Sequence, residues 1–161
     1  MRKSTALLGF ILLLLIALAA SFVIGGTLSA RLSIATGSAA DYPQAFDAIR
    51  RVIASGAAPQ VFADALPADA SGYRLEDVTI TLVNRGLFSA EWLYVEAEAA
   101  PGDVAVYSVT GEGDSIGARG TGTVNLKLIT AADSAAERTY RVQYYVYGMK
   151  RTITVIQNGA S

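Results

Sequence analysis

The stretch VTITLVNRG, residues 78–86, decides the fold of this chain. Apolar residues at 78, 80 and 82 alternate with threonines at 79 and 81, and this period of two is typical of a β-strand with one buried face. The residues Asn84, Arg85 and Gly86 that follow favour a turn. The stretch therefore predicts a half-buried strand that ends in a turn.

The same alternation continues on both sides of this strand. Seven candidate strands result, at 60–63, 74–83, 90–98, 104–109, 123–130, 139–147 and 151–156. Glycine-rich or proline-containing turn signals separate them every ten or so residues. This spacing predicts an all-β domain over residues 57–161, an Ig-like antiparallel β-sandwich. The predicted core residues are Val78, Ile80, Leu82, Leu93, Val95, Val104, Val106, Val124, Leu126, Leu128, Tyr140, Val142, Tyr144, Val146, Ile153 and Val155.

Residues 78–95 resemble the bacterial Ig-like surface modules of the CARDB-like type, in which a strand ends in an Asn-x-Gly turn before the next strand crosses. The matching text is VTITLVNRG at 78–86 and AEWLYV at 90–95, and GTGTVNL at 120–126 is similar to a glycine-led strand entry. The resemblance covers about half of the chain and implies an Ig-like sandwich. This chain departs from the family in having one module behind a helix and an apolar run, so the resemblance carries the fold and not an adhesive role.

The amino-terminal segment carries no charge from residue 4 to residue 30, directly after Arg2 and Lys3. These 27 residues exceed the roughly 20 that cross a bilayer as a helix, which predicts a transmembrane anchor over residues 1–30. The small residues at 17–21 also resemble a signal-peptide cleavage site, but the apolar run continues through Leu28 and favours an uncleaved anchor. Arg2 and Lys3 place the amino terminus in the cytoplasm and the carboxy-terminal domain outside the cell membrane.

A linker and a helix are expected between the anchor and the sandwich. Residues 31–40 are small and polar, which is typical of a short linker. Over residues 41–56 we predict an amphipathic helix with Asp41 at its start, Gly56 at its end and an apolar stripe that includes Phe46, Ile49 and Ile53. Such a stripe is typical of a helix that packs on its own domain.

Composition excludes several kinds of chemistry. The chain has no His and no Cys, which removes Ser-His-Asp triads, thiolate nucleophiles and histidine-bound zinc. Residues 32–161 contain ten basic and fourteen acidic residues, a net charge of −4, and the cations are scattered, which argues against a nucleic-acid partner. No pair of carboxylates is placed for catalysis. We therefore predict a protein that is not an enzyme, with no cofactor and no metal site.

Aromatic residues supply the candidate binding surface. Alternation along the strand at 139–147 places Tyr145 and Tyr147 on the face opposite Tyr144, and Trp92 and Tyr94 lie on the strand at 90–98. These four exposed rings could form a platform for a sugar or a protein. Tyrosine is also a common strand residue, so a purely structural role is the alternative.

Three small residues in the apolar run suggest self-association. Ala17, Ser21 and Gly25 are spaced by four and would share one face of a helix, where small side chains let two helices approach in a membrane. This pattern predicts a homodimer through the anchor.

The sequence thus predicts a non-enzymatic, single-pass envelope protein that displays an Ig-like binding or structural module outside the membrane. Its expected partners are the lipid bilayer, through residues 4–30, and a protein or a cell-wall glycan. One alternative is a small accessory subunit of a membrane assembly. The other is a secreted carbohydrate- or protein-binding module, released by signal cleavage.

Overall fold

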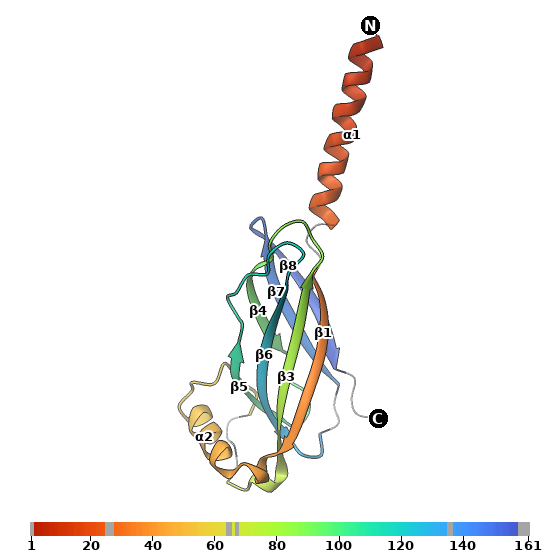
Figure 1. The fold of residues 1–161 in the computed structure, drawn as a ribbon. Helices are drawn as coiled ribbons and strands as arrows, with labels where there is room; N and C mark the ends of the chain where they lie inside the picture. The colour runs from red at the N-terminus through yellow and green to blue at the C-terminus, as the bar shows by residue number, and fades with distance from the viewer. Residues whose placement is uncertain (1, 25–27, 64–65, 67, 135–136, 158–161) are drawn as a thin grey trace.

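A computed structural model of the chain describes residues 2–24, 28–63, 66, 68–134 and 137–157. A long helix leads into a β-sandwich, and a second helix lies beside the far end of the sandwich (Figure 1). The helices are α1 Arg2–Ile24 and α2 Pro43–Ala54, and the strands are β1 Leu28–Ser38, β2 Gln60–Val61, β3 Tyr73–Asn84, β4 Glu91–Ala97, β5 Asp103–Thr110, β6 Thr121–Ala131, β7 Arg138–Val146 and β8 Met149–Gln157. Two 3-10 turns, Ala39–Asp41 and Ala70–Gly72, flank the ends of strands.

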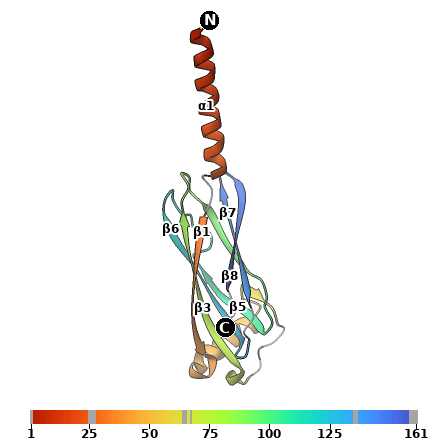
Figure 2. The same cartoon turned by 90° about the vertical axis from the view of Figure 1, so that its right-hand side faces the viewer.

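Two antiparallel sheets form the sandwich. The larger sheet has the order β1-β3-β6-β5-β2 and the smaller has the order β4-β7-β8. Figure 2 shows the layers side by side, with β1, β3 and β6 in one and β7 and β8 in the other. All seven predicted strands are present close to their predicted bounds, and the mostly-β, antiparallel sandwich is confirmed.

The strand β1 corrects the prediction of a linker at residues 31–40. It pairs with β3 along its whole length, from Leu28 opposite Asn84 to Ser38 opposite Arg74. The physical reason is the alternation in LSARLSI at 28–34, whose apolar positions pack against the core between the sheets. The predicted anchor over 1–30 therefore extends too far, since α1 ends at Ile24 and residues 28–30 belong to β1.

The main core lies between the two sheets and contains most of the predicted core residues. Two of them, Ile153 and Val155, are only partly buried because they lie on β8, an edge strand of the smaller sheet. Val104 is buried in a second cluster, outside the larger sheet and beneath α2. The sandwich therefore has one core between its sheets and one between a sheet and a helix.

Helix α2 covers the outer side of the larger sheet near its far end. Phe46, Ile49 and Ile53 are buried as predicted, against Val104 and Ile129. Asp41 lies in the 3-10 turn before the helix, so the predicted start at residue 41 is corrected to Pro43. The predicted end is confirmed, since Gly56 adopts a left-handed φ of +70° just after the last turn.

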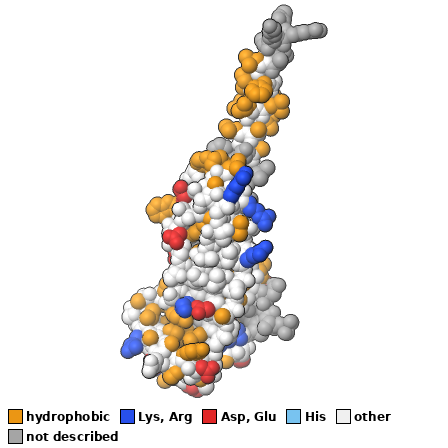
Figure 3. Space-filling view, in the orientation of Figure 1, with side chains coloured by type: hydrophobic (Ala, Val, Ile, Leu, Met, Phe, Trp, Pro, Cys, Tyr) orange, Lys and Arg blue, Asp and Glu red, His pale blue; other side chains and the backbone are white. Residues whose placement is uncertain are grey.

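Helix α1 lies apart from the sandwich in Figures 1 and 2. Its large apolar side chains from Leu7 to Leu18 are 49–73% exposed, and Figure 3 shows them along the helix. Among the described side chains, which on α1 are those of residues 7–20, no helical stretch is both long and apolar enough to cross a membrane. Of the three small residues predicted to pair two helices, Ala17 lies on α1, whereas the side chain of Ser21 and all of Gly25 fall outside the described residues.

Candidate binding surface

One end of the sandwich contains Leu28, the first residue of β1. Hydrogen bonds between four segments hold this end together. The Leu28 amide donates to the hydroxyl of Tyr144 on β7, at 3.3 Å. The buried Asn84 side chain donates to the carbonyls of Phe88 at 2.7 Å and of Ile116 and Gly117, both at 3.1 Å. We call this region the proximal end: residue 28, the connections 85–90, 111–120 and 147–148, and the strand residues next to them.

Trp92 reaches the surface of the proximal end through a β-bulge. β4 and β7 pair at Glu91 with Tyr145 and at Tyr94 with Gln143, which leaves one extra residue on β4. Trp92 has a φ of +56°, and its side chain is 69% exposed. A left-handed backbone costs a non-glycine residue roughly 1–3 kcal/mol. The bulge therefore directs the indole outward at the expense of local strain.

Tyr147 occupies a strained position of its own. It forms the two-residue turn between β7 and β8 with Gly148, and both residues have positive φ, +52° and +71°. Two positive φ angles define the type I′ hairpin turn, which favours Asn or Gly at its first position. The Tyr147 ring instead packs edge-on against Phe88, with ring centroids 4.3 Å apart, and remains 55% exposed.

These rings line two neighbouring hollows. Trp92 and Tyr145 line the first, with a volume of about 430 Å³, together with Glu91 and Gly148. Tyr147 lines the second, with a volume of about 370 Å³, and Glu91 borders both. Tyr145 is exposed and Tyr144 is buried, as the alternation predicts, whereas Tyr147 is exposed in the turn beyond the end of β7. Tyr94 is also exposed, but it lines neither of these hollows.

Away from the proximal end, the outer face of the smaller sheet is charged. Arg141 on β7 forms an ion pair with Glu98 and lies 3.9 Å from Glu96 on the neighbouring strand. Exposed apolar side chains also occur on this sheet away from the proximal end, at Tyr94 and Ile156, but they lie apart from the two hollows.

The opposite end of the sandwich, which we call the distal end, contains a buried ionic cluster that the sequence did not predict. Arg138 is 2% exposed and donates to Asp103, to Glu76 at 2.7 Å and to Gln157 at 3.1 Å. Burial lowers the pKa of the Arg138 guanidinium, but its hydrogen bonds and charge interactions with Asp103 and Tyr140 outweigh burial and raise the pKa. Burial also raises the pKa of the Tyr140 hydroxyl. All these charges are paired, so the cluster is structural.

The glycine-rich turn at 111–115 does not combine with Asp103 into a cation site. The Glu112 carboxylate accepts a hydrogen bond from the Val95 amide at 2.7 Å, whereas Asp103 is paired with Arg138. Among the described residues, no group of three or more acidic side chains is arranged to hold a metal ion.

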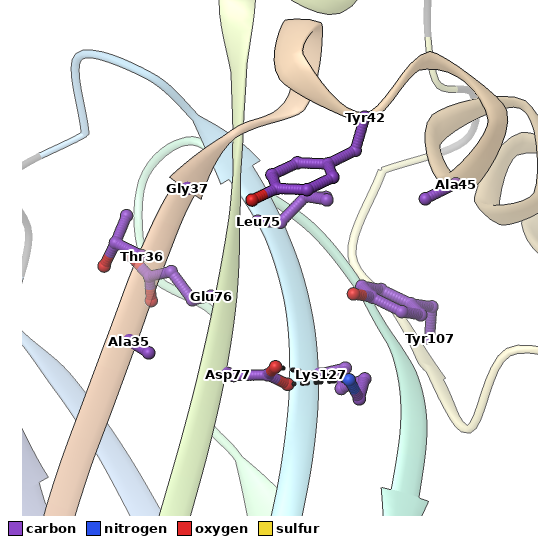
Figure 4. A pocket seen from close by; sticks show the side chains of 10 residues that line it. All are labelled: Ala35, Thr36, Gly37, Tyr42, Ala45, Leu75, Glu76, Asp77, Tyr107 and Lys127. Atoms are coloured by element: carbon purple, nitrogen blue, oxygen red, sulfur yellow. Dashed lines mark hydrogen bonds and ion pairs between the residues drawn. The ribbon is translucent and has the colours of Figure 1, made fainter.

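A groove of about 400 Å³ lies at the distal end, where α2 begins (Figure 4). The rings of Tyr42 and Tyr107 line the groove, and so does the ion pair between Asp77 and Lys127, whose charged atoms are 3.1 Å apart. Burial and the charge of Asp77 raise the pKa of Tyr107 to about 12. The sequence did not single out these residues, because they come from four elements that only the fold brings together.

No family model and no curated protein matches this chain. Among solved structures, it is similar to the GAE domain of GGA2p from Saccharomyces cerevisiae, with 10% identity, a TM-score of 0.40, and coverage of 63% of this chain and 97% of that one. It is also similar to a FixG-related protein from Vibrio parahaemolyticus, with 10% identity, a TM-score of 0.36, and coverage of 80% and 92%. The cupredoxin domain of amoB from Nitrosocaldus yellowstonii has 14% identity, a TM-score of 0.32, and coverage of 85% and 93%. Similarities with TM-scores this low give no information about function.

Proposed function

We propose that this protein is a non-enzymatic membrane protein whose helix α1 inserts into the bilayer and whose Ig-like sandwich is displayed outside the cell as a binding or structural module. The observation that carries the proposal is the set of exposed apolar side chains on α1. A helix that leaves this much apolar surface uncovered needs an apolar environment.

The length of α1 agrees with this role. Its 23 residues, Arg2–Ile24, extend about 34 Å at 1.5 Å per residue, against a hydrocarbon core of about 30 Å. Side chains of α1 are described for residues 7–20, and the uncharged run of the sequence extends beyond them on both sides. Arg2 and Lys3 would remain on the cytoplasmic side.

The charged groups of the sandwich support a role without catalysis. Asp103 and Glu76 are buried in ion pairs with Arg138, and Glu98 is paired with Arg141 at the surface. Glu76 borders the groove of Figure 4, but its carboxylate is paired with Arg138. A protein or glycan partner in the envelope would meet the distal end of the module, where the groove of Figure 4 lies.

The test is to isolate the protein from its own cells in mild detergent and to identify its amino-terminal peptide and any co-purifying protein by mass spectrometry. We expect an intact segment from Met1 to Arg31 in the membrane fraction. A mature chain that begins near Ala20 would instead establish a secreted module and contradict the anchor. A stoichiometric protein partner would support the accessory-subunit alternative.

A pair of variants tests the role of α1 in the same fraction. Leu12→Lys with Ile16→Lys places two charges in the apolar run and should release the protein from membranes washed at alkaline pH. The matched control, Leu12→Ala with Ile16→Ala, keeps the helix apolar and should remain bound.

A further inference from the structure

The proximal end of the sandwich must lie close to Ile24, the last residue of α1. From Ile24 to Leu28 the chain has four residue steps, which span at most about 14 Å in any conformation. The polar layer on each side of a bilayer is about 5–8 Å thick. If α1 lies in the membrane, as proposed above, the proximal end must therefore lie at or next to the lipid headgroups.

Exposed aromatic and apolar side chains gather at this same end. Trp92 is 69% exposed and Tyr147 is 55% exposed, and each occupies a left-handed backbone position that stability alone does not favour. Tyr145, Leu87 and Met149 add further exposed apolar surface. Trp and Tyr are enriched where membranes meet water, because their rings are apolar and their N–H or O–H groups are polar.

Charge divides the sandwich in the same direction. The proximal end carries five cations against three carboxylates: Arg31, Arg85, Arg119, Lys150 and Arg151 against Glu91, Glu112 and Asp114. The rest of the chain from residue 32 onward has six basic and eleven acidic residues. Figure 3 shows Lys and Arg side chains on the β1 and β8 side of the end that faces α1. This end therefore attracts an anionic surface, and the rest of the sandwich, taken together, is repelled by one.

We propose that the proximal end docks onto the headgroup layer of a bilayer that contains anionic phospholipids. Arg85, Lys150 and their neighbours bind lipid phosphates, and Trp92 and Tyr147 enter the boundary between headgroups and acyl chains. The inference rests on the proposed membrane insertion of α1. It adds a second contact with the membrane, made by the folded module, which fixes how the module is oriented on the surface.

The single tryptophan of the chain provides a direct test, because its fluorescence reports only on Trp92. The full-length protein is reconstituted into vesicles of phosphatidylcholine with or without phosphatidylglycerol. With phosphatidylglycerol, we expect a blue-shifted emission, quenching by bromine-labelled acyl chains and protection from acrylamide. Without it, or in high salt, these effects should weaken because the charge attraction is lost or screened.

Two charge-reversal variants separate docking from insertion. Arg85→Glu with Lys150→Glu should lose the lipid quenching of Trp92 yet still float with the vesicles through α1. The matched control, Arg50→Glu with Arg51→Glu on α2 at the distal end, should behave as the unmodified protein does. Flotation of the unmodified protein with a water-exposed Trp92 would overturn the docking proposal and leave the anchor standing. A protein that does not float would overturn the anchor itself, and a Trp92 shift seen only in native membranes would assign the surface to a protein partner.

Discussion

Trp92 and Tyr147 stand out at the scale of single residues because each is an exposed aromatic residue with a positive φ, +56° and +52°. Gly111 shares this region of the backbone, with a φ of +85°, for a different reason. A Cβ at residue 111 would lie 2.3 Å from the carbonyl oxygen of Thr123, so only glycine fits there. Packing explains why residue 111 must be glycine, but it does not explain why residue 92 is tryptophan.

Replacing Trp92 tests whether its side chain contributes to folding. We expect Trp92→Asn to keep or raise the free energy of unfolding by up to about 1 kcal/mol, because Asn tolerates a left-handed backbone better and the indole is exposed. Urea denaturation followed by circular dichroism measures this. Leu93→Ala, at the buried neighbouring position, should cost about 2–5 kcal/mol. A comparable loss in Trp92→Asn would mean that the indole stabilises the fold.

The alternation of the sequence was enough to predict that Tyr145 faces outward and Tyr144 inward. It did not predict the bulge at Trp92, because the phase shift that the extra residue causes falls at the start of β4, where too few alternating residues precede it to make the shift visible. The strained turn at Tyr147 was likewise hidden, since the sequence lacks the Asn-Gly pair that usually indicates it.

At the scale of elements, β1 is the main difference between the predicted and the observed fold. Its first residues belong to the uncharged run, which predicts an anchor, and its small polar residues are typical of a linker. The alternating signal at 28–34 was present in the sequence, but the adjoining apolar helix masked it. The other seven strands and α2 were predicted because glycine, proline and asparagine separate them clearly.

Truncation at two points tests the importance of β1. Removing residues 1–27 should leave a folded domain, because every strand is retained. Removing residues 1–38 exposes the edge of β3 along its whole length and uncovers part of the core, so we expect an unfolded or aggregating product. Circular dichroism and size-exclusion chromatography compare the two. Equal stability of both products would show that β1 is dispensable.

The buried cluster around Arg138 allows a second test at this scale. Arg138→Met leaves Asp103 and Glu76 buried without their countercharge, and we expect a loss of about 3–5 kcal/mol in the free energy of unfolding. Arg141→Met, which breaks an exposed pair on the same strand, should cost about 1 kcal/mol or less. Similar costs for both variants would show that the cluster is not what stabilises the distal end. The sequence did not predict this cluster because its members are far apart along the chain.

At the scale of the whole molecule, surface character changes along the long axis. The apolar helix α1 comes first, the cationic proximal end follows, and the more acidic remainder of the sandwich comes last. The proposed orientation places α2 outside the cell and Lys3 inside. Because the chain has no Cys, one introduced cysteine gives a single labelling site.

Labelling of intact cells with a membrane-impermeant maleimide tests this orientation. Arg51→Cys on the exposed face of α2 should react directly, and Lys3→Cys should react only after permeabilisation. The reverse pattern would contradict the proposed orientation. Arg85→Cys at the proximal end should react more slowly than Arg51→Cys if the lipid surface covers it.

The full-length pairing of β1 with β3 also has a mechanical consequence. β1 is the strand joined to α1, and it runs from the proximal end to the distal end, where β8 also ends. Tension between a membrane and a load at the distal end would act parallel to β1. The hydrogen bonds between β1 and β3 lie across that direction, so they would resist as a group, in shear, and would not open one at a time from an end. The strand that follows the helix thus gives the module a tether suited to bearing load.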